Sequence, residues 1–244
     1  PGIKMPGIWE YQFRLSSNRT KRIFASVGAW QAFHDENSAR NHELTGSLSY
    51  RPFDMLSIAL AAKYGNYYND LQYVRSTTIN NDPRYIFGTL DRETLYFTFR
   101  VDYNISPEFT IQFYGSPYLS GGLYSDYKKI TNSKDETYTN RFRGFDTNEI
   151  SYSSDLDQYQ VNEAGLDFAN YSFHDPNFNF REFRSNLVLR WEYRAGSTVY
   201  LVWSQSRTGM SYEGDFSLSD DFSNLFNIHP SDVVMLKFSY RFIN

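Results

Sequence analysis

The chain has four histidines, which are its only imidazoles for acid–base chemistry. It has no cysteine, so a thiol nucleophile is excluded. Two of them precede an aspartate, in His34-Asp35 and His174-Asp175. Neighbouring residues on an extended strand point to opposite faces, so these pairs can act together only in loops. The chain also lacks the Gly-x-Ser-x-Gly motif that carries a hydrolase serine. We therefore expect surface or capping histidines and predict no catalytic residue.

A group of acidic residues precedes the end of the chain and could offer oxygen ligands to calcium: Glu213, Asp215, Asp220 and Asp221. They lack the regular Asp-x-Asp-x-Asp-Gly spacing of a calcium loop. Solvated loop charge explains them better. No metal site and no cofactor are predicted.

Charged residues on the polar face of alternating segments are more informative. In an extended segment every second side chain lies on the same face. The polar face is expected to carry mostly basic residues, although the net charge of the chain is −4. Its predicted members, besides Glu10, are Arg14, Arg51, Lys63, Arg100, Asp102, Arg184, Arg190, Glu192, Lys237 and Arg241. They form either a basic inner wall that attracts an anionic solute or an acidic plug segment, or an ion-pair network completed by other carboxylates.

Nine alternating segments must position these residues: 9–16, 22–34, 44–51, 56–64, 94–103, 109–114, 183–193, 199–204 and 233–242. In the last, Leu236 and Phe238 share one face and Lys237 and Arg241 the other. Short connections alternate mostly with long ones, near 65–92, 117–179 and 206–230, as in barrels with tight turns at one end and long external loops at the other. The sequence predicts an all-β protein, a single domain over 1–244, folded as an antiparallel transmembrane β-barrel of the outer-membrane type.

Aromatic residues support this interpretation, because 21 Tyr and 21 Phe exceed the usual needs of a soluble core. The turns near 18–21, 51–54, 105–108 and 194–197 should share the side of the C-terminus. An aromatic belt is then expected at that membrane interface, formed by Tyr50, Tyr103, Trp191, Tyr193, Tyr240 and Phe242. No apolar run reaches the length of a transmembrane helix. The negative net charge argues against nucleic acid as a partner.

Four segments carry a family resemblance: DPNFNF at 175–180, LVLRWEYRAGSTVYLVWSQ at 187–205, FNIHP at 226–230 and LKFSYRF at 236–242. They resemble an uncharacterised family of bacterial outer-membrane proteins, which joins an N-terminal domain similar to family-nine carbohydrate-binding modules to a C-terminal β-barrel of unknown function. Family members commonly have proline where Ala195 stands here, and this change leaves the turn intact. The resemblance covers roughly the last 70 residues. It implies the barrel but no reaction, and sugar binding cannot be carried over without the N-terminal domain.

Single-chain bacterial barrels usually have an even number of strands, so nine segments indicate either that one strand escapes the alternation or that the chain is the C-terminal part of a larger barrel. We favour the second explanation. We expect a protein of the Gram-negative outer membrane that acts in transport, or as a scaffold for uptake or secretion, with the lipid bilayer as its partner. The N-terminal domain or other envelope proteins are further candidate partners. Two alternatives remain open, an outer-membrane enzyme with a loop-borne site and a soluble carbohydrate-binding β-sandwich.

Overall fold

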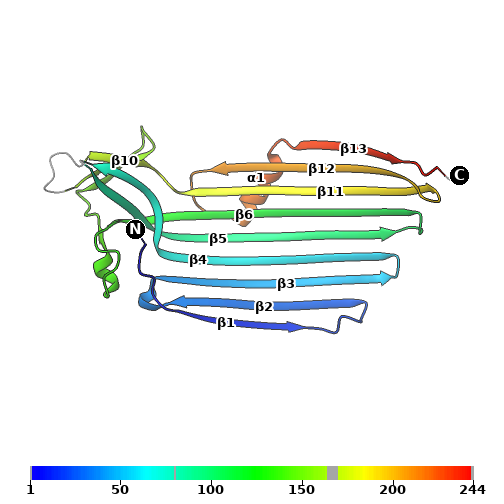
Figure 1. Cartoon of the computed structure of the whole chain (residues 1–244), viewed down its shortest axis with the longest axis horizontal. Coiled ribbons are helices and arrows are strands. Elements are labelled where there is room, and N and C mark those ends of the chain that lie inside the picture. Colours follow the sequence, from blue (N-terminus) through cyan, green and yellow to red (C-terminus); the bar gives the residue numbers. More distant parts are fainter. Residues whose placement is uncertain (1, 80, 164–169, 243–244) are drawn as a thin grey trace.

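The main body of the protein is one long, antiparallel β-sheet (Figure 1). The computed structural model describes residues 2–79, 81–163 and 170–242. Nine strands follow one another across the sheet, and each pairs with its neighbours in antiparallel register. In spatial order they are β1 (Ile8–Ser16), β2 (Ile23–His34), β3 (Ala39–Phe53), β4 (Leu56–Ile79), β5 (Asp82–Asn104), β6 (Phe109–Ile130), β11 (Phe178–Arg194), β12 (Ser197–Ser211) and β13 (Ser231–Ser239).

The connection between β6 and β11 folds into a small unit at one end of the sheet, which we call the cap. Its elements are η2 (Tyr138–Arg141), β7 (Phe142–Gly144), β8 (Ile150–Ser153), β9 (Gln158–Asn162) and β10 (Asn170–His174). Strands β8 to β10 form a second antiparallel sheet, while β7 pairs with β6. The apolar side of the small sheet packs on the long ends of β5 and β6 around Ile86, Tyr127, Val161 and Phe173.

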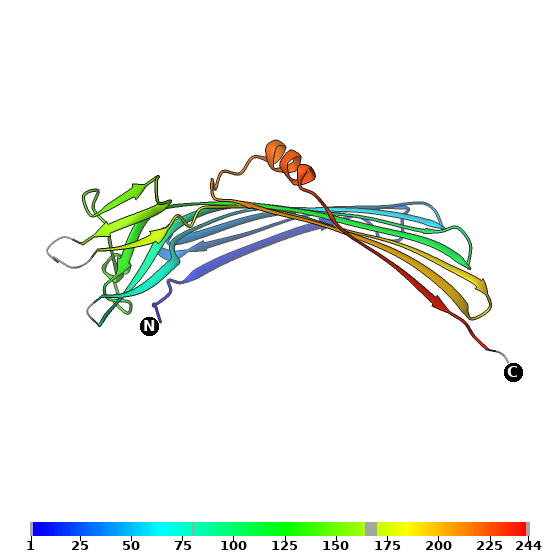
Figure 2. The same cartoon turned by 90° about the horizontal axis from the view of Figure 1, so that it is seen from above.

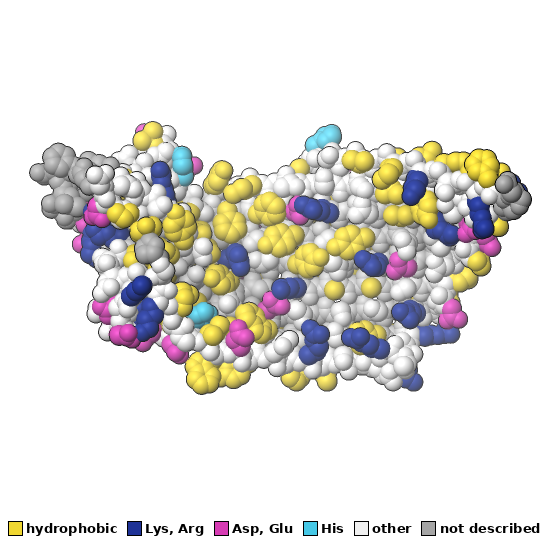
Figure 3. All heavy atoms as spheres, viewed as in Figure 1, with side chains coloured by type: hydrophobic (Ala, Val, Ile, Leu, Met, Phe, Trp, Pro, Cys, Tyr) yellow, Lys and Arg dark blue, Asp and Glu magenta, His cyan; other side chains and the backbone are white. Residues whose placement is uncertain are grey.

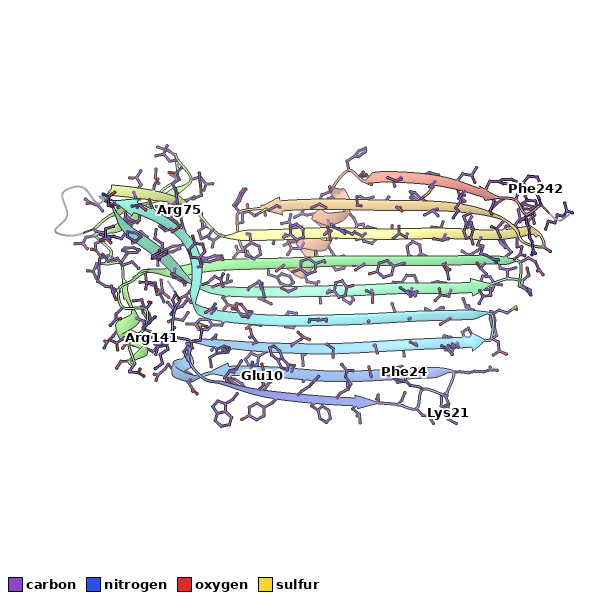
Figure 4. The ribbon with its side chains drawn as sticks, in the orientation of Figure 1. Glu10, Lys21, Phe24, Arg75, Arg141 and Phe242 are labelled. Atoms are coloured by element: carbon purple, nitrogen blue, oxygen red, sulfur yellow. The ribbon has the colours of Figure 1, made fainter. Side chains whose placement is uncertain are left out.

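The tight turns between β1 and β2, β3 and β4, β5 and β6, and β11 and β12 all lie at the end opposite the cap, as predicted. We call it the turn end. Lys21 and Phe242 mark this end, and Arg75 and Arg141 mark the cap end (Figure 4). At the cap end, a short 3-10 helix, η1 (Asp35–Asn37), joins β2 to β3.

The two faces of the main sheet differ sharply in chemistry. The register joins apolar residues of all nine strands into one continuous surface on the convex side of the arched sheet (Figure 2), which we call the apolar band. Representative members, one from each strand, are Phe13, Val27, Leu48, Leu60, Phe99, Phe113, Leu189, Leu201 and Leu236. Many are exposed, among them Phe13 at 62 % and Leu236 at 70 %. An exposed apolar area of this extent is typical of a surface that binds another protein or a membrane.

One helix, α1 (Leu218–Asn227), lies on this convex face at the cap-side border of the apolar band. Leu225 packs on Leu95 and Leu119, and the Phe222 ring meets the Phe97 ring edge to face, with 6.1 Å between the ring centres. The buried Asp221 accepts hydrogen bonds of 2.9 Å from Arg181 and Asn179 of β11. Within the described ranges, no helix is long and apolar enough to cross a membrane.

The predicted long loops differ from the structure. Strands β4 and β5 run through most of 65–92 and meet near residue 81, and β6 continues to Ile130 inside the predicted 117–179 loop, of which 164–169 fall outside the described residues. In 206–230, β12 continues to Ser211 and α1 follows. Register shifts near Asn69, Tyr73 and Phe87 move side chains from one face to the other. Such bulges erase the period of two, so these strand ends look irregular in sequence.

The predicted all-β, antiparallel class is confirmed, and the main sheet follows the predicted nine-strand path. In the described chain the sheet does not close, since β1 and β13 each have one strand neighbour. The last strand was predicted to reach Phe242, but its pairing ends at Ser239 opposite Thr198, one residue after β12 begins at Ser197.

Candidate functional site

The concave face of the main sheet carries the polar residues of every strand and is the candidate site (Figure 3). Its middle rows consist largely of small hydroxyl and methyl side chains, for example Ser26, Ser47 and Ala61, which are register partners. Lysine and arginine side chains are scattered among them. Small side chains between lysine and arginine side chains leave hollows, so the concave face combines open space with charge.

Three of the predicted wall cations are paired with carboxylates. The closest nitrogen–oxygen distances are 2.6 Å for Lys63 and Glu43, 2.7 Å for Arg184 and Glu182, and 2.7 Å for Arg190 and Glu192. Sequence reasoning missed Glu43 and Glu182 as partners because both lay outside the short segments assigned as strands. For these cations the wall is therefore an ion-pair network.

The other predicted cations make no ion pair with a described residue. Arg100 lies over the Tyr114 ring, 5.6 Å from its centre, and Lys237 lies 5.9 Å from the centre of the Tyr200 ring. Arg51 lines a small hollow at the turn end with Arg19, Lys21 and Arg22. The remaining predicted wall residues are Arg14 on β1, Asp102 on β5 and Arg241, whose backbone N–H donates to the Ser197 hydroxyl at 3.0 Å.

Two adjoining hollows form a groove across the cap-side half of the concave face. One has a volume of about 470 Å³ and is lined by Trp30, Glu43, Gly65 and Tyr67 among others. The other, about 500 Å³, is lined by Phe178, Phe180 and Met210 among others. Arg92 and Tyr118 line both hollows and join them. We call this surface the concave groove.

Gly65 explains the depth of the first hollow. It lies in register between Glu43 and Thr94, and its missing side chain leaves space between them. A Cβ atom placed there would find only the His42 carbonyl oxygen, at 3.7 Å, which is ordinary contact distance. The glycine is therefore not required by crowding, and its effect is to keep the groove open.

Arg92 is the distinctive charge of the groove. Its guanidinium lies 4.9 Å from the centre of the Tyr67 ring, and no carboxylate among the described residues pairs with it. Its Nε atom is buried without a hydrogen-bond partner, as is the Oδ1 atom of Asn41 in the same hollow. Unpaired polar atoms away from water cost free energy that a ligand can recover.

The groove residues were not predicted, although one signal was present. Trp30 falls on the polar face of its strand, opposite the face that carries Val27 and Ala29. A large ring on a wet wall is a candidate platform for a ligand. Arg92 and Tyr118 lay within predicted loops, so their faces could not be assigned.

The predicted belt residues all lie near the turn end. Tyr193 stacks on Phe238 with 5.4 Å between ring centres, and Tyr240 meets Phe242 at 4.8 Å. Trp191 lies 6.0 Å from Tyr193, and Tyr103 packs edge to face on Phe53. Tyr50, 42 % exposed, belongs to the apolar band on β3. The structure thus gathers these rings, and their role at a lipid interface stays a prediction.

The cap contains a second cluster of charges, centred on the buried carboxylate of Glu163. It accepts hydrogen bonds from Arg84 Nε at 3.2 Å, from the Tyr171 hydroxyl at 3.0 Å and from Lys129. Burial alone would raise the pKa of Glu163, but the bonds from Lys129 and Tyr171 and the charges of Lys129 and Arg84 outweigh it and hold that pKa below its ordinary value. The cluster fastens the start of β5 and the end of β6 to the cap.

The histidines show no catalytic arrangement among the described residues. His42 packs edge to face on Phe33, and His229 contacts the carbonyl of Pro230 through Nδ1. In the acidic group, Asp221 accepts hydrogen bonds from Arg181 and Asn179, and Asp220 accepts a hydrogen bond from the Ser217 hydroxyl. In the described part of the chain, no three His, Asp or Glu side chains lie close enough to hold a metal ion.

Fold and site together define an all-β protein of antiparallel sheets whose main sheet has one apolar and one polar face. The chain belongs to the family described as a domain of unknown function, DUF5916, whose model matches residues 2–244. No curated protein and no solved structure matches the chain. Membership of an uncharacterised family is confirmed, while the outer-membrane location and the carbohydrate-binding-like domain remain expectations from the resemblance.

Proposed function

We propose that this chain forms a lipid-facing wall of an outer-membrane β-barrel of a Gram-negative bacterium, with the concave face lining an aqueous interior that serves transport or acts as a scaffold for uptake or secretion. One observation carries the proposal. The apolar band is continuous over nine strands and exposed, while the opposite face of the same strands is polar. A membrane barrel needs this division, because lipid contacts one face and water the other.

The dimensions of the apolar band support the same proposal. On β4 it extends from Leu56 to Tyr64, close to the roughly 9–11 residues that a tilted strand needs to cross the hydrocarbon layer. Its cap-side border lies at Asn66 and Glu93 on β4 and β5, but at Gln205 and Asp232 on β12 and β13, nearer the turn end. A border that crosses the register is expected when strands tilt relative to the membrane normal.

The open edges then require further strands. Unpaired backbone N–H and C=O groups cost several kcal/mol each in lipid, so spanning sheets close. Strands β1 and β13 each present one such edge. We propose that additional strands pair with both edges and complete the barrel, which agrees with the expectation that the chain is one part of a larger barrel.

Tryptophan positions provide a direct test. Trp9, Trp191 and Trp203 lie in the apolar band and are 62, 54 and 41 % exposed, whereas Trp30 lies on the concave face. In bilayers that contain brominated lipid, we expect Trp191→Phe and Trp203→Phe each to remove part of the fluorescence quenched by bromine. Trp30→Phe should leave the quenched part unchanged.

The rival reading is a soluble sandwich in which a second sheet covers the apolar band. It predicts that brominated lipid quenches none of these residues and that the protein stays dispersed without detergent. Quenching that is lost equally in all variants, Trp30→Phe included, would also contradict the proposed division of faces.

Ion selectivity tests the basic wall. Arg100 has no carboxylate partner among the described residues, while Arg190 is paired with Glu192. An unpaired charge about 4 Å from an ion in water stabilises an anion by about 1 kcal/mol and destabilises a cation by about the same amount. Arg100→Gln should therefore lower the anion-to-cation permeability ratio by up to roughly thirtyfold. Arg190→Gln exposes the charge of Glu192 and should act in the same direction. Reversal potentials in planar bilayers measure the ratio, and unchanged values in both variants would remove the basic-wall hypothesis.

A further inference from the structure

We propose that the concave groove is a binding site for an acidic oligosaccharide, a chain of sugar rings that carries a carboxylate on one of the bound rings. The inference rests on the proposed function, in which the concave face lines the aqueous interior. It adds the class of solute that the wall would bind and the residues that would bind it.

The shape and the rings of the groove point to a flat, elongated ligand. Trp30, Tyr67 and Tyr118 line the first hollow, and Phe178 and Phe180 line the second. Aromatic side chains on several strands offer successive platforms that run across the sheet. Both hollows open widely to the concave side, and an open groove suits a chain of several units better than a single small molecule.

The polar groups between the rings point to a ligand rich in hydroxyl groups. The unpaired Oδ1 of Asn41 can accept a hydrogen bond, and the phenol groups of Tyr67 and Tyr118 can donate and accept. An aromatic acid without hydroxyls would leave Asn41 unpaired. A sugar ring satisfies it while its apolar face stacks on an aromatic side chain.

Arg92 supplies the specificity for a carboxylate. It stands where the two hollows join, and no carboxylate of the described chain pairs with it. A guanidinium fork matches a carboxylate through two parallel hydrogen bonds. Tyr67 holds the guanidinium from one side, at 4.9 Å, which limits the entropy lost when the ligand binds.

The charge balance of the groove argues against a ligand with one charge in every unit, such as single-stranded nucleic acid. Glu43 and Glu182 also line the hollows, and each neutralises a neighbouring cation, Lys63 and Arg184 respectively. Arg92 is thus the cation of the groove that is left for a ligand. A phosphate backbone would need a row of such cations.

Binding of sialyllactose, a trisaccharide with one carboxylate, to the detergent-solubilised protein is measured by calorimetry and tests the inference. Its methyl ester and maltotriose serve as uncharged probes, and a decathymidylate serves as the polyanion. We expect Arg92→Gln to weaken sialyllactose binding by about tenfold to a hundredfold and to leave binding of the ester nearly unchanged. The trisaccharide should shift tryptophan fluorescence in the wild type and not in Trp30→Phe.

Two glycine variants locate the site without removing a contact residue. Gly65→Leu fills the groove from its floor, and we expect it to abolish binding of both the acid and the ester. Gly46→Leu is the matched control on the neighbouring strand, because Gly46 lies in the apolar band with open space around it. That variant should bind like the wild type.

Several results would overturn the inference. Decathymidylate binding as tightly as the acidic trisaccharide would contradict it, and so would equal affinities for the acid and its ester. Binding that survives Gly65→Leu would also contradict it. So would a failure to bind any trisaccharide in protein whose strand content matches the wild type. All are read in detergent, so they are independent of the quenching by brominated lipid that tests the proposed function.

Discussion

Ala62→Arg is expected to destabilise the membrane-inserted protein by about 2–4 kcal/mol, the cost of an arginine near the middle of the lipid-facing side of a barrel. Ala62 lies in the apolar band between its register partners Gly46 and Phe97. An arginine at this position would face lipid, with neither water nor a carboxylate to stabilise its charge. Denaturant unfolding of the protein in lipid vesicles measures the free energy of unfolding.

Ala61→Arg is the matched control, since Ala61 is the adjacent residue on the same strand and faces the concave side between Ser47 and Thr98. On a water-facing wall the same substitution should cost much less, about 0–1 kcal/mol as at positions near the interfaces. Equal losses of stability in the two variants would contradict a lipid contact on the convex face. A larger loss for Ala61→Arg would reverse the assignment of the faces.

The second large effect is expected in the cap, where Glu163→Gln should lower the local free energy of unfolding by about 3–5 kcal/mol. The substitution removes a carboxylate whose side chain is 1 % exposed. It leaves Lys129 with no carboxylate partner and Arg84 with only the exposed Asp82. A buried ion pair that loses one partner leaves an uncompensated charge, which is why the cost exceeds that of a surface pair. Hydrogen exchange of β9 and β10 reads this stability.

The same carboxylate predicts how the cap responds to acid. The folded-state pKa of Glu163 lies below its ordinary value, so its contribution is complete above the pKa of an unfolded glutamate, about 4.3, and is lost as pH falls through the lower folded value. The wild-type cap should therefore lose protection below about pH 4, and Glu163→Gln should remove that part of the pH dependence.

Glu136→Gln provides the control for both measurements. Glu136 lies in the same connection between β6 and β11 and pairs with Lys4 near the N-terminus, but its side chain is 88 % exposed. We expect no measurable change in the protection of β9 and β10. If Glu163→Gln proved as mild as Glu136→Gln, the cluster would not be what fastens the cap to β5 and β6.

The alternation of residues was enough to assign the faces of the main strands. Leu236 and Phe238 were expected on one apolar face, and the register places them there through their pairs with Leu201 and Val199. The tight turns at one end also followed from the sequence. In the turn at 194–197, for example, Gly196 adopts a φ of 76°, which glycine accepts without steric cost. A period of two is a local property, so a single strand reveals it.

What only the tertiary structure decided depends on contacts between distant segments. Leu218, Phe222 and Leu225 have helical spacing, yet α1 exists as a packed element because Leu225 finds Leu95 and Leu119 on two other strands. The concave groove requires Trp30, Arg92 and Phe178 from three strands to meet in register. The ends of β4 and β5 continue past bulges that reverse the side-chain phase. The sequence therefore determined which side of each strand is apolar, because alternation acts within a strand, whereas the groove and the cap arise only when the register aligns neighbouring strands.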